Sequence, residues 1–118
     1  MNLVKTVNIG GPIFEIEWTE DGAAIIAALG NGKIKAIQIA SGQIAEVAEH
    51  IGITSMKLIT MQNQMFILTI GQDQNLVFWN LGNPQPILTV KLQHVPNVMD
   101  FSMPYLVIGC NDSQIAVI

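Results

Sequence analysis

The chain has 118 residues, of which half are hydrophobic and only 12% are charged. This length supplies one domain with one core. The formal net charge is −4, with five Lys and Arg residues in all. We therefore expect no RNA binding by this chain alone, because such affinity comes from neutralising phosphates. The longest apolar run, Ala23–Leu29, is far too short to span a membrane, and the first five residues lack the apolar core of a signal peptide.

The single cysteine, Cys110, and the two histidines, His50 and His94, lie at no metal-ligand spacing. The sequence therefore predicts no metal site and no cofactor. A lone cysteine in a predicted strand is usually a small buried hydrophobic residue. A chain without an internal disulfide fits an intracellular, reducing compartment.

The apolar pattern predicts a succession of short strands with turns between them. Alternation of apolar and polar residues indicates half-buried strands, whereas the continuous apolar run Ala23–Leu29 indicates a strand buried on both faces. Such a succession predicts an antiparallel all-β fold. In chain order the twelve expected strands are Leu3–Ile9, Ile13–Trp18, Ala23–Leu29, Lys33–Ile37, Gln43–Glu49, Ile53–Ile59, Met65–Ile70, Asn75–Leu81, Ile87–Leu92, Val98–Phe101, Tyr105–Cys110 and Gln114–Ile118.

Residues 39–51 also fit a helix, which is the main alternative in this reading. The stretch between Gly42 and Gly52 is too short for a stable helix without strong packing, so we favour a strand. The residues at helical spacing are Ile44, Val47, Ala48 and Ile51.

Three stretches of the chain repeat one pattern, a polar turn followed by an alternating strand. Asn31, Asp73 and Asp112 hold the same turn position, at successive spacings of 42 and 39 residues. These spacings are close to the roughly 40–45 residues of WD repeats. A second shared position, at the end of the strand, is held by Ile37, Trp79 and Ile118.

We therefore predict one domain over residues 1–118, a WD-type β-propeller segment of three four-stranded antiparallel blades. The repeats run approximately over 1–42, 43–84 and 85–118, each beginning with its outer strand. Three blades cannot close a ring, because propellers typically have about four to eight. The sequence leaves open whether the chain is a fragment, a subunit completed by another chain, or a homo-oligomer.

The second repeat resembles the WD40 family in individual residues. Trp79-Asn80 stands where the family has a Trp-Asp pair, and His50 lies 23 residues before Asp73. The resemblance implies a buried hydrogen-bonded set of His50, Thr69, Asp73 and Trp79, here called the tetrad, in which the aspartate of a tight turn is paired with the histidine. The first repeat loses the set, with Ile9, Asn31 and Ile37 at three of its positions, and the third repeat keeps only Asp112.

Longer stretches resemble the family of mRNA export factors that dock at nuclear pores, and related spindle-checkpoint WD40 proteins. This resemblance covers nearly the whole chain, about repeats two to four of such a propeller. It implies binding of a short hairpin motif of a Gly-Leu-Phe-Gly repeat nucleoporin on the propeller face, but it assigns no partner-binding residue here. The matching stretches are Gly11–Trp18, Asp21-Gly22, Gln43–His50, Leu76–Asn80, Pro86–Leu92, Met99–Phe101, Met103–Tyr105 and Val107-Ile108.

Other polar residues have ordinary interpretations. His50, Thr69 and Asp73 superficially offer a catalytic set, but the repeat register gives them a structural role. His94 is interpreted as a solvated loop histidine. The carboxylates of the first repeat are interpreted as a solvated acidic face; they are Glu15, Glu17, Glu20, Asp21, Glu46 and Glu49.

The expected function is a non-enzymatic WD-repeat scaffold that presents a propeller face to a protein or peptide partner. We expect an export-factor-like role at the nuclear pore, with a nucleoporin as partner and a location in the nucleus or nuclear envelope and the cytoplasm. The ring would be completed by another chain or by further copies. The alternatives are a spindle-checkpoint or generic WD40 scaffold and, remotely, a propeller hydrolase.

Overall fold

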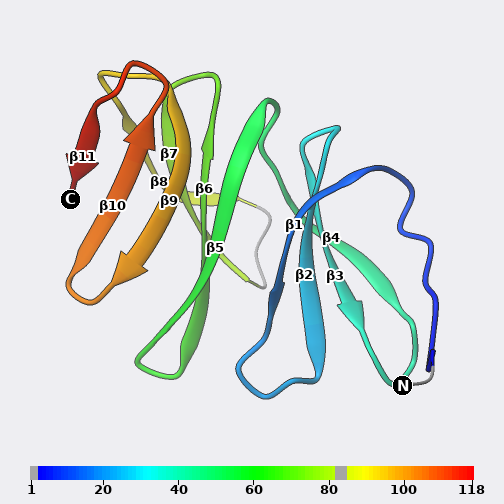
Figure 1. The fold of residues 1–118 in the computed structure, drawn as a ribbon. Coiled ribbons are helices and arrows are strands. Elements are labelled where there is room, and N and C mark those ends of the chain that lie inside the picture. Colours follow the sequence, from blue (N-terminus) through cyan, green and yellow to red (C-terminus); the bar gives the residue numbers. More distant parts are fainter. Residues whose placement is uncertain (1–2, 82–84) are drawn as a thin grey trace.

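The computed structural model describes residues 3–81 and 85–118 (Figure 1). These residues form eleven strands in three antiparallel sheets of four, four and three strands. The sheets stand side by side in a row, with the two ends of the chain at opposite ends of the row (Figure 1). The predicted all-β propeller segment is confirmed. The described residues include no helical segment that could cross a bilayer.

Within each sheet, every strand pairs with the next one along the chain, because short turns can join only antiparallel neighbours. The helical alternative for residues 39–51 is wrong, since that stretch contains β4. The first sheet consists of β1 (Ile13–Trp18), β2 (Ala24–Leu29), β3 (Lys33–Gln38) and β4 (Ile44–Glu49). The second consists of β5 (Ile53–Met61), β6 (Gln64–Gly71), β7 (Asn75–Asn80) and β8 (Pro86–Lys91). The third consists of β9 (Pro96–Ser102), β10 (Tyr105–Cys110) and β11 (Ile115–Val117).

The segment Leu3–Ile9 is not a strand, so that part of the prediction is wrong. A strand needs the N–H and C=O groups of a neighbouring strand, and none of the described strands pairs with this segment. The segment lies along the first sheet instead: Lys5 Nζ donates to the carbonyl oxygen of Ile39 at 2.8 Å, and Lys35 Nζ donates to that of Ile9 at 2.9 Å. Because the third sheet has three strands, only two of the expected four-stranded blades are complete.

Hydrophobic side chains fill two layers, one on each side of the second sheet. The central strand β6 contributes to both: Ile67 packs toward the first sheet and Leu68 toward the third, and both are fully buried. An apolar run without polar interruption is what such a strand requires. The buried members of the first layer are Ile26, Ala28, Ile34, Ala48, Ile53, Met56, Ile67, Val77 and Trp79, and those of the second are Ile59, Leu68, Ile70, Leu76, Met99, Leu106 and Ile108.

The first strands of the three sheets, β1, β5 and β9, lie next to one another and share one register. We call them the inner strands. Each has an irregularity in its pairing just after Ile13, Ile53 or Pro96. The residues three positions after this irregularity are equivalent in the three sheets, and they are Ile16, Met56 and Met99. The residues four positions after it are Glu17, Lys57 and Asp100.

One turn position in the first sheet requires glycine. Gly32 has a φ of +89°, and a Cβ atom there would lie 2.8 Å from the Cα of Ile51 and 2.9 Å from the carbonyl oxygen of His50. The equivalent residues Gln74 and Ser113 also have positive φ, at 66° and 72°. The three sheets therefore share this turn, and in the first sheet the backbone of His50 and Ile51 leaves no room for a Cβ atom at Gly32.

Candidate functional site

The tetrad residues of the second sheet come together at the turn between β6 and β7. His50 Nδ1 lies 2.7 Å from Thr69 Oγ1, and His50 Nε2 lies 3.0 and 3.1 Å from the two carboxylate oxygens of Asp73. Trp79 Nε1 donates to Thr69 Oγ1 at 2.9 Å. One set of proton positions satisfies every atom: the indole donates to the hydroxyl, the hydroxyl to Nδ1, and Nε2–H to the carboxylate.

The four side chains differ in burial. His50, Thr69 and Trp79 are 5%, 0% and 5% exposed, whereas the side chain of Asp73 is 41% exposed. The expectation that the turn buries this aspartate is therefore wrong. A loop of two or three residues cannot cover a carboxylate at its own tip, so water reaches Asp73 while the protein covers its partner.

Asp73 also organises the turn that carries it. The backbone N–H of Asn75 donates to its Oδ1 at 3.1 Å, and the Asn75 side-chain amide donates to Oδ2 at 3.2 Å. Burial alone would raise the pKa of Asp73, but the hydrogen bonds from His50 and Asn75 outweigh it and hold the pKa below its ordinary value. In the first sheet Asn31 stabilises the equivalent turn in the same way, because its Oδ1 accepts a hydrogen bond from the N–H of Lys33 at 3.0 Å.

The first sheet replaces the polar set with a hydrophobic cluster. Ile9 stands at the histidine position, Ala27 at the threonine position and Ile37 at the tryptophan position, and with Leu29 they form one buried cluster. Replacing all partners of a buried hydrogen-bonded set with apolar groups leaves none of them unsatisfied. The same place in the repeat is therefore filled in two chemically different ways.

The third sheet has a remnant of the set that the sequence did not reveal. His94 Nδ1 contacts Asp112 Oδ2, with side chains 37% and 52% exposed. His94 lies in a loop and is partly exposed to solvent, as its interpretation as a solvated loop histidine expects, but it also has a carboxylate partner. Ile108 and Ile118 stand at the threonine and tryptophan positions, so the pair lacks the buried half of the network. The missed signal is that His94, like His50, follows an outer strand and precedes an inner one.

Charged residues of the inner strands alternate in sign from one sheet to the next. Lys57 Nζ lies 3.9 Å from Glu17 Oε1 and 3.8 Å from Asp100 Oδ1. The neighbouring Glu15 accepts from Ser55 Oγ at 3.2 Å and from the N–H of Met56 at 3.4 Å. Burial raises the pKa of Glu15 despite these hydrogen bonds. Glu15 and Glu17 therefore join two sheets, and their assignment to a solvated acidic face is wrong.

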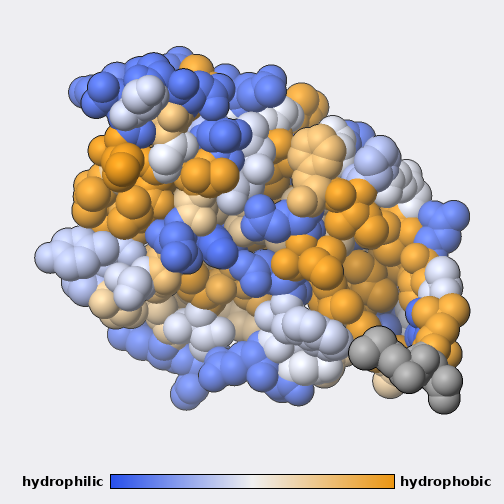
Figure 2. Space-filling model, in the orientation of Figure 1, coloured by the Kyte–Doolittle hydropathy of each residue, from blue (hydrophilic) through white to orange (hydrophobic). Residues whose placement is uncertain are grey.

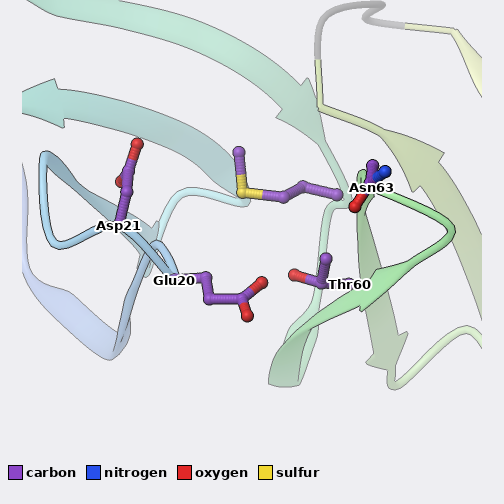
Figure 3. A pocket seen from close by; sticks show the side chains of 5 residues that line it. Glu20, Asp21, Thr60 and Asn63 are labelled. Atoms are coloured by element: carbon purple, nitrogen blue, oxygen red, sulfur yellow. The ribbon is translucent and has the colours of Figure 1, made fainter.

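Two other carboxylates of the first sheet do lie at a surface. Glu20 and Asp21, from the β1–β2 turn, line a shallow groove together with Thr60, Asn63 and Met65 of the β5–β6 hairpin, and the Glu20 side chain points toward Thr60 (Figure 3). Hydrogen bonds from the Ala23 N–H and the Thr19 hydroxyl lower the pKa of Asp21. The groove lies at the opposite end of the strands from the tetrad, and its polar rim has no set of groups arranged for catalysis.

The remaining expected features concern metals and Cys110. Within residues 3–81 and 85–118, no three His, Cys, Asp or Glu side chains are grouped to hold a metal ion. Cys110 is a free cysteine at the edge of the second hydrophobic layer. Burial and the nearby Asp112 carboxylate raise the pKa of its thiol, which keeps it in the unreactive neutral form.

Comparison with known proteins gives relatives of one kind. No protein-family model matches the chain. It is 31% identical over 109 residues to the mRNA export factor GLE2 of Chaetomium thermophilum and 28% identical over 102 residues to protein Rae1 of Drosophila melanogaster. The Poly(A)+ RNA export protein of Schizosaccharomyces pombe is 28% identical over 110 residues. These matches take in 86–92% of this chain but only 30–31% of each relative.

Solved structures agree on the fold. The computationally designed Ika4 protein matches 90% of this chain with a TM-score of 0.67 at 18% identity, and the match takes in 64% of Ika4. Kluyveromyces lactis Hsv2 matches 92% of this chain with a TM-score of 0.60 at 17% identity, over 33% of Hsv2. At these identities the likeness concerns the fold alone. The homologues found by sequence are the Rae1/GLE2 mRNA export factors, which are WD40 β-propeller proteins.

Proposed function

We propose that this chain is part of a non-enzymatic WD-repeat scaffold with an mRNA-export role at the nuclear pore. The observation that carries the proposal is the match over most of the chain to proteins named as mRNA export factors. In this role the scaffold presents one propeller face to a protein partner, a short nucleoporin hairpin, and acts in the nucleus, the nuclear envelope and the cytoplasm. The chain spans about 30% of the length of those relatives, so the proposal concerns a part of such a scaffold.

The geometry of the tetrad supports a structural role over a catalytic one. A nucleophile must reach a substrate, but Thr69 is fully buried, and its oxygen already meets both the indole N–H and the imidazole. No buried side-chain nitrogen or oxygen among the described residues lacks a hydrogen-bond partner. A network satisfied within itself stabilises a turn and leaves no group free for chemistry.

The proposal includes completion of the ring. In a propeller each blade is covered on both faces by its neighbours, and the first and third sheets each have one face without a neighbour among the described residues. A scaffold face that spans several blades requires those neighbours.

Binding of a nucleoporin hairpin tests the proposed role. The chain is titrated into a fluorescein-labelled hairpin segment of a Gly-Leu-Phe-Gly nucleoporin, and anisotropy is recorded. Saturable binding that a sequence-scrambled peptide does not give is expected. If the folded chain leaves the anisotropy unchanged up to its solubility limit, the nucleoporin role is contradicted, and a different scaffold role must be considered.

A further inference from the structure

The shallow groove beside the β1–β2 turn has both of its walls within the described chain. One wall is this turn of the first sheet and the other is the β5–β6 hairpin of the second, and the two sheets pack on each other through the first hydrophobic layer. We call it the inter-sheet groove. Its volume of about 290 Å³ is at the lower limit of the roughly 300–1,000 Å³ that sites for whole small molecules occupy. The groove therefore has room for one long side chain.

The second sheet supplies an apolar floor for this groove. β1 ends at Trp18, the equivalent of Leu58, whereas β5 continues in its pairing with β6 and sets Thr60 opposite Met65. This pair stands two positions beyond Leu58 and Ile67, so its side chains lie on the face of the second sheet that packs on the first sheet. The half-buried Met65 therefore extends the apolar face past the end of β1 and into the groove.

The first sheet supplies two carboxylates. Oδ1 of Asp21 accepts from the Thr19 hydroxyl at 2.7 Å and from the Ala23 N–H at 3.0 Å, so the turn holds this side chain in place while Oδ2 keeps its lone pairs for another donor. No ion pair within residues 3–81 and 85–118 includes Glu20 or Asp21. The groove is therefore negatively charged, and the described part of the chain places no cation beside these two carboxylates.

Hydrogen-bonding groups on the opposite wall are available as well. The side chains of Thr60 and Asn63 are exposed, and neither has a side-chain hydrogen bond to another residue that the structure describes. The Glu20 side chain points toward Thr60 (Figure 3). Acceptor oxygens from two sheets therefore border one groove that has an apolar floor.

We propose that the inter-sheet groove binds an arginine side chain of a protein partner. The guanidinium lies between the carboxylates of the first sheet and the polar side chains of the hairpin, and the methylene stem lies on Met65. This contact goes beyond the proposed nucleoporin role and lies at the end of the strands opposite the tetrad. Figure 2 shows mostly hydrophilic residues along the lower edge of the molecule, where the β1–β2 turn and the β5–β6 hairpin lie in Figure 1.

The chemistry of the groove favours arginine over other cations. A guanidinium has five N–H donors in a planar fork, so it can bond to a carboxylate and to neutral oxygens at the same time. Its methylene stem can cover an apolar surface while the charged head stays near water. A lysine ammonium is a compact, strongly hydrated charge and has only about three donors. A metal ion does not fit, because no three His, Cys, Asp or Glu side chains are grouped in the described residues.

Titration of the chain with a capped peptide tests the proposal. The probe is acetyl-Ala-Arg-Ala-amide, and two matched probes have citrulline, the uncharged analogue of arginine, or lysine in its place. Amide shifts of the ¹⁵N-labelled chain are followed by NMR. Glu20→Gln removes one groove carboxylate, whereas Asp21 is kept because it holds the turn. The matched control is Glu49→Gln, an exposed glutamate at the other end of the strands with the same change in charge.

The expected result is saturable shifts confined to residues 19–22 and 60–65 with the arginine probe. Citrulline or lysine in the probe, or Glu20→Gln in the chain, should weaken binding by about fivefold, the size of one lost charge-assisted contact at a surface. Glu49→Gln should leave it unchanged. Absent or scattered shifts overturn the proposal, as does an equal loss in both variants, and equal binding of lysine overturns the choice of arginine. Because the groove is remote from the tetrad end, either this proposal or the nucleoporin role can fail without the other.

Discussion

At the scale of single residues, the tetrad divides into a buried half and an exposed half. Thr69 joins the buried half, since its hydroxyl contacts both Trp79 Nε1 and His50 Nδ1. Asp73 belongs to the exposed half, where water can replace a lost partner. We therefore expect the free energy of unfolding to depend more on Thr69 than on Asp73.

Thr69→Val is expected to lower the free energy of unfolding by about 2–4 kcal/mol, because two buried polar atoms lose their partner at once. Asp73→Ala is expected to cost less, about 1–2 kcal/mol, because solvent reaches the site. Urea denaturation followed by tryptophan fluorescence measures both. Thr89→Val on the exposed strand β8 is the matched control, with an expected change within about 0.5 kcal/mol. Equal costs for Thr69→Val and Thr89→Val would contradict the network.

Glu15 should make the protein less stable as the pH rises. Burial raises its pKa in the folded state, so between the unfolded and folded pKa values the folded chain binds more protons, and stability falls with rising pH. Glu15→Gln removes this penalty and keeps a group that can accept from Ser55. We expect the variant to be slightly more stable than the wild type at pH 7, where the Glu15 carboxylate is ionised, and to lose this advantage below the ordinary glutamate pKa of about 4.3. Thermal melts at the two pH values measure the difference, and a loss at pH 7 would mean that the charge itself stabilises the junction.

The tetrad could be predicted from sequence because His50, Asp73 and Trp79 stand at the positions that the resemblance to WD40 repeats implies for it. Spacing carries no information on solvent access, and for this reason the exposure of Asp73 could not be foreseen. The His94–Asp112 contact could not be predicted from the sequence for a different reason. The loop before β9 is one residue longer than the loop before β5, counted from the equivalent amides of Leu92 and His50. His94 stands two residues after Leu92, so it lies outside the expected register.

At the scale of elements, periodicity predicts a strand well where a partner strand is present. The alternating stretch Ile44–Glu49 and the unbroken run Ala24–Leu29 both became strands, because each can satisfy its backbone groups on a neighbour. Leu3–Ile9 has a similar pattern and did not. Pattern selects which face of a strand is buried, but pairing decides whether the strand exists.

Gly32→Ala is expected to destabilise the first sheet by about 2–4 kcal/mol, since a positive φ costs about 1–2 kcal/mol for a residue with a Cβ and the clash with His50 and Ile51 adds to it. Gly22→Ala is the matched control: its φ is +70°, but nothing lies within 4 Å of an added Cβ. We expect only the conformational cost of about 1 kcal/mol there. Differential scanning calorimetry measures the Tm of both variants. Similar shifts in Tm would show that the backbone at Ile51 moves away from the added Cβ atom without lowering stability.

At the scale of the whole molecule, the positively charged side chains already have partners within the protein. All five basic residues are lysines, and each has a carbonyl or carboxylate oxygen within ion-pair or hydrogen-bond reach. We therefore expect negligible affinity for single-stranded RNA at an ionic strength of about 0.15 M. Anisotropy with a labelled oligonucleotide measures it, and submicromolar binding would contradict the expectation. The contacts are Lys5 to Ile39, Lys33 to Glu46, Lys35 to Ile9, Lys57 to Glu17 and Asp100, and Lys91 to Asp73.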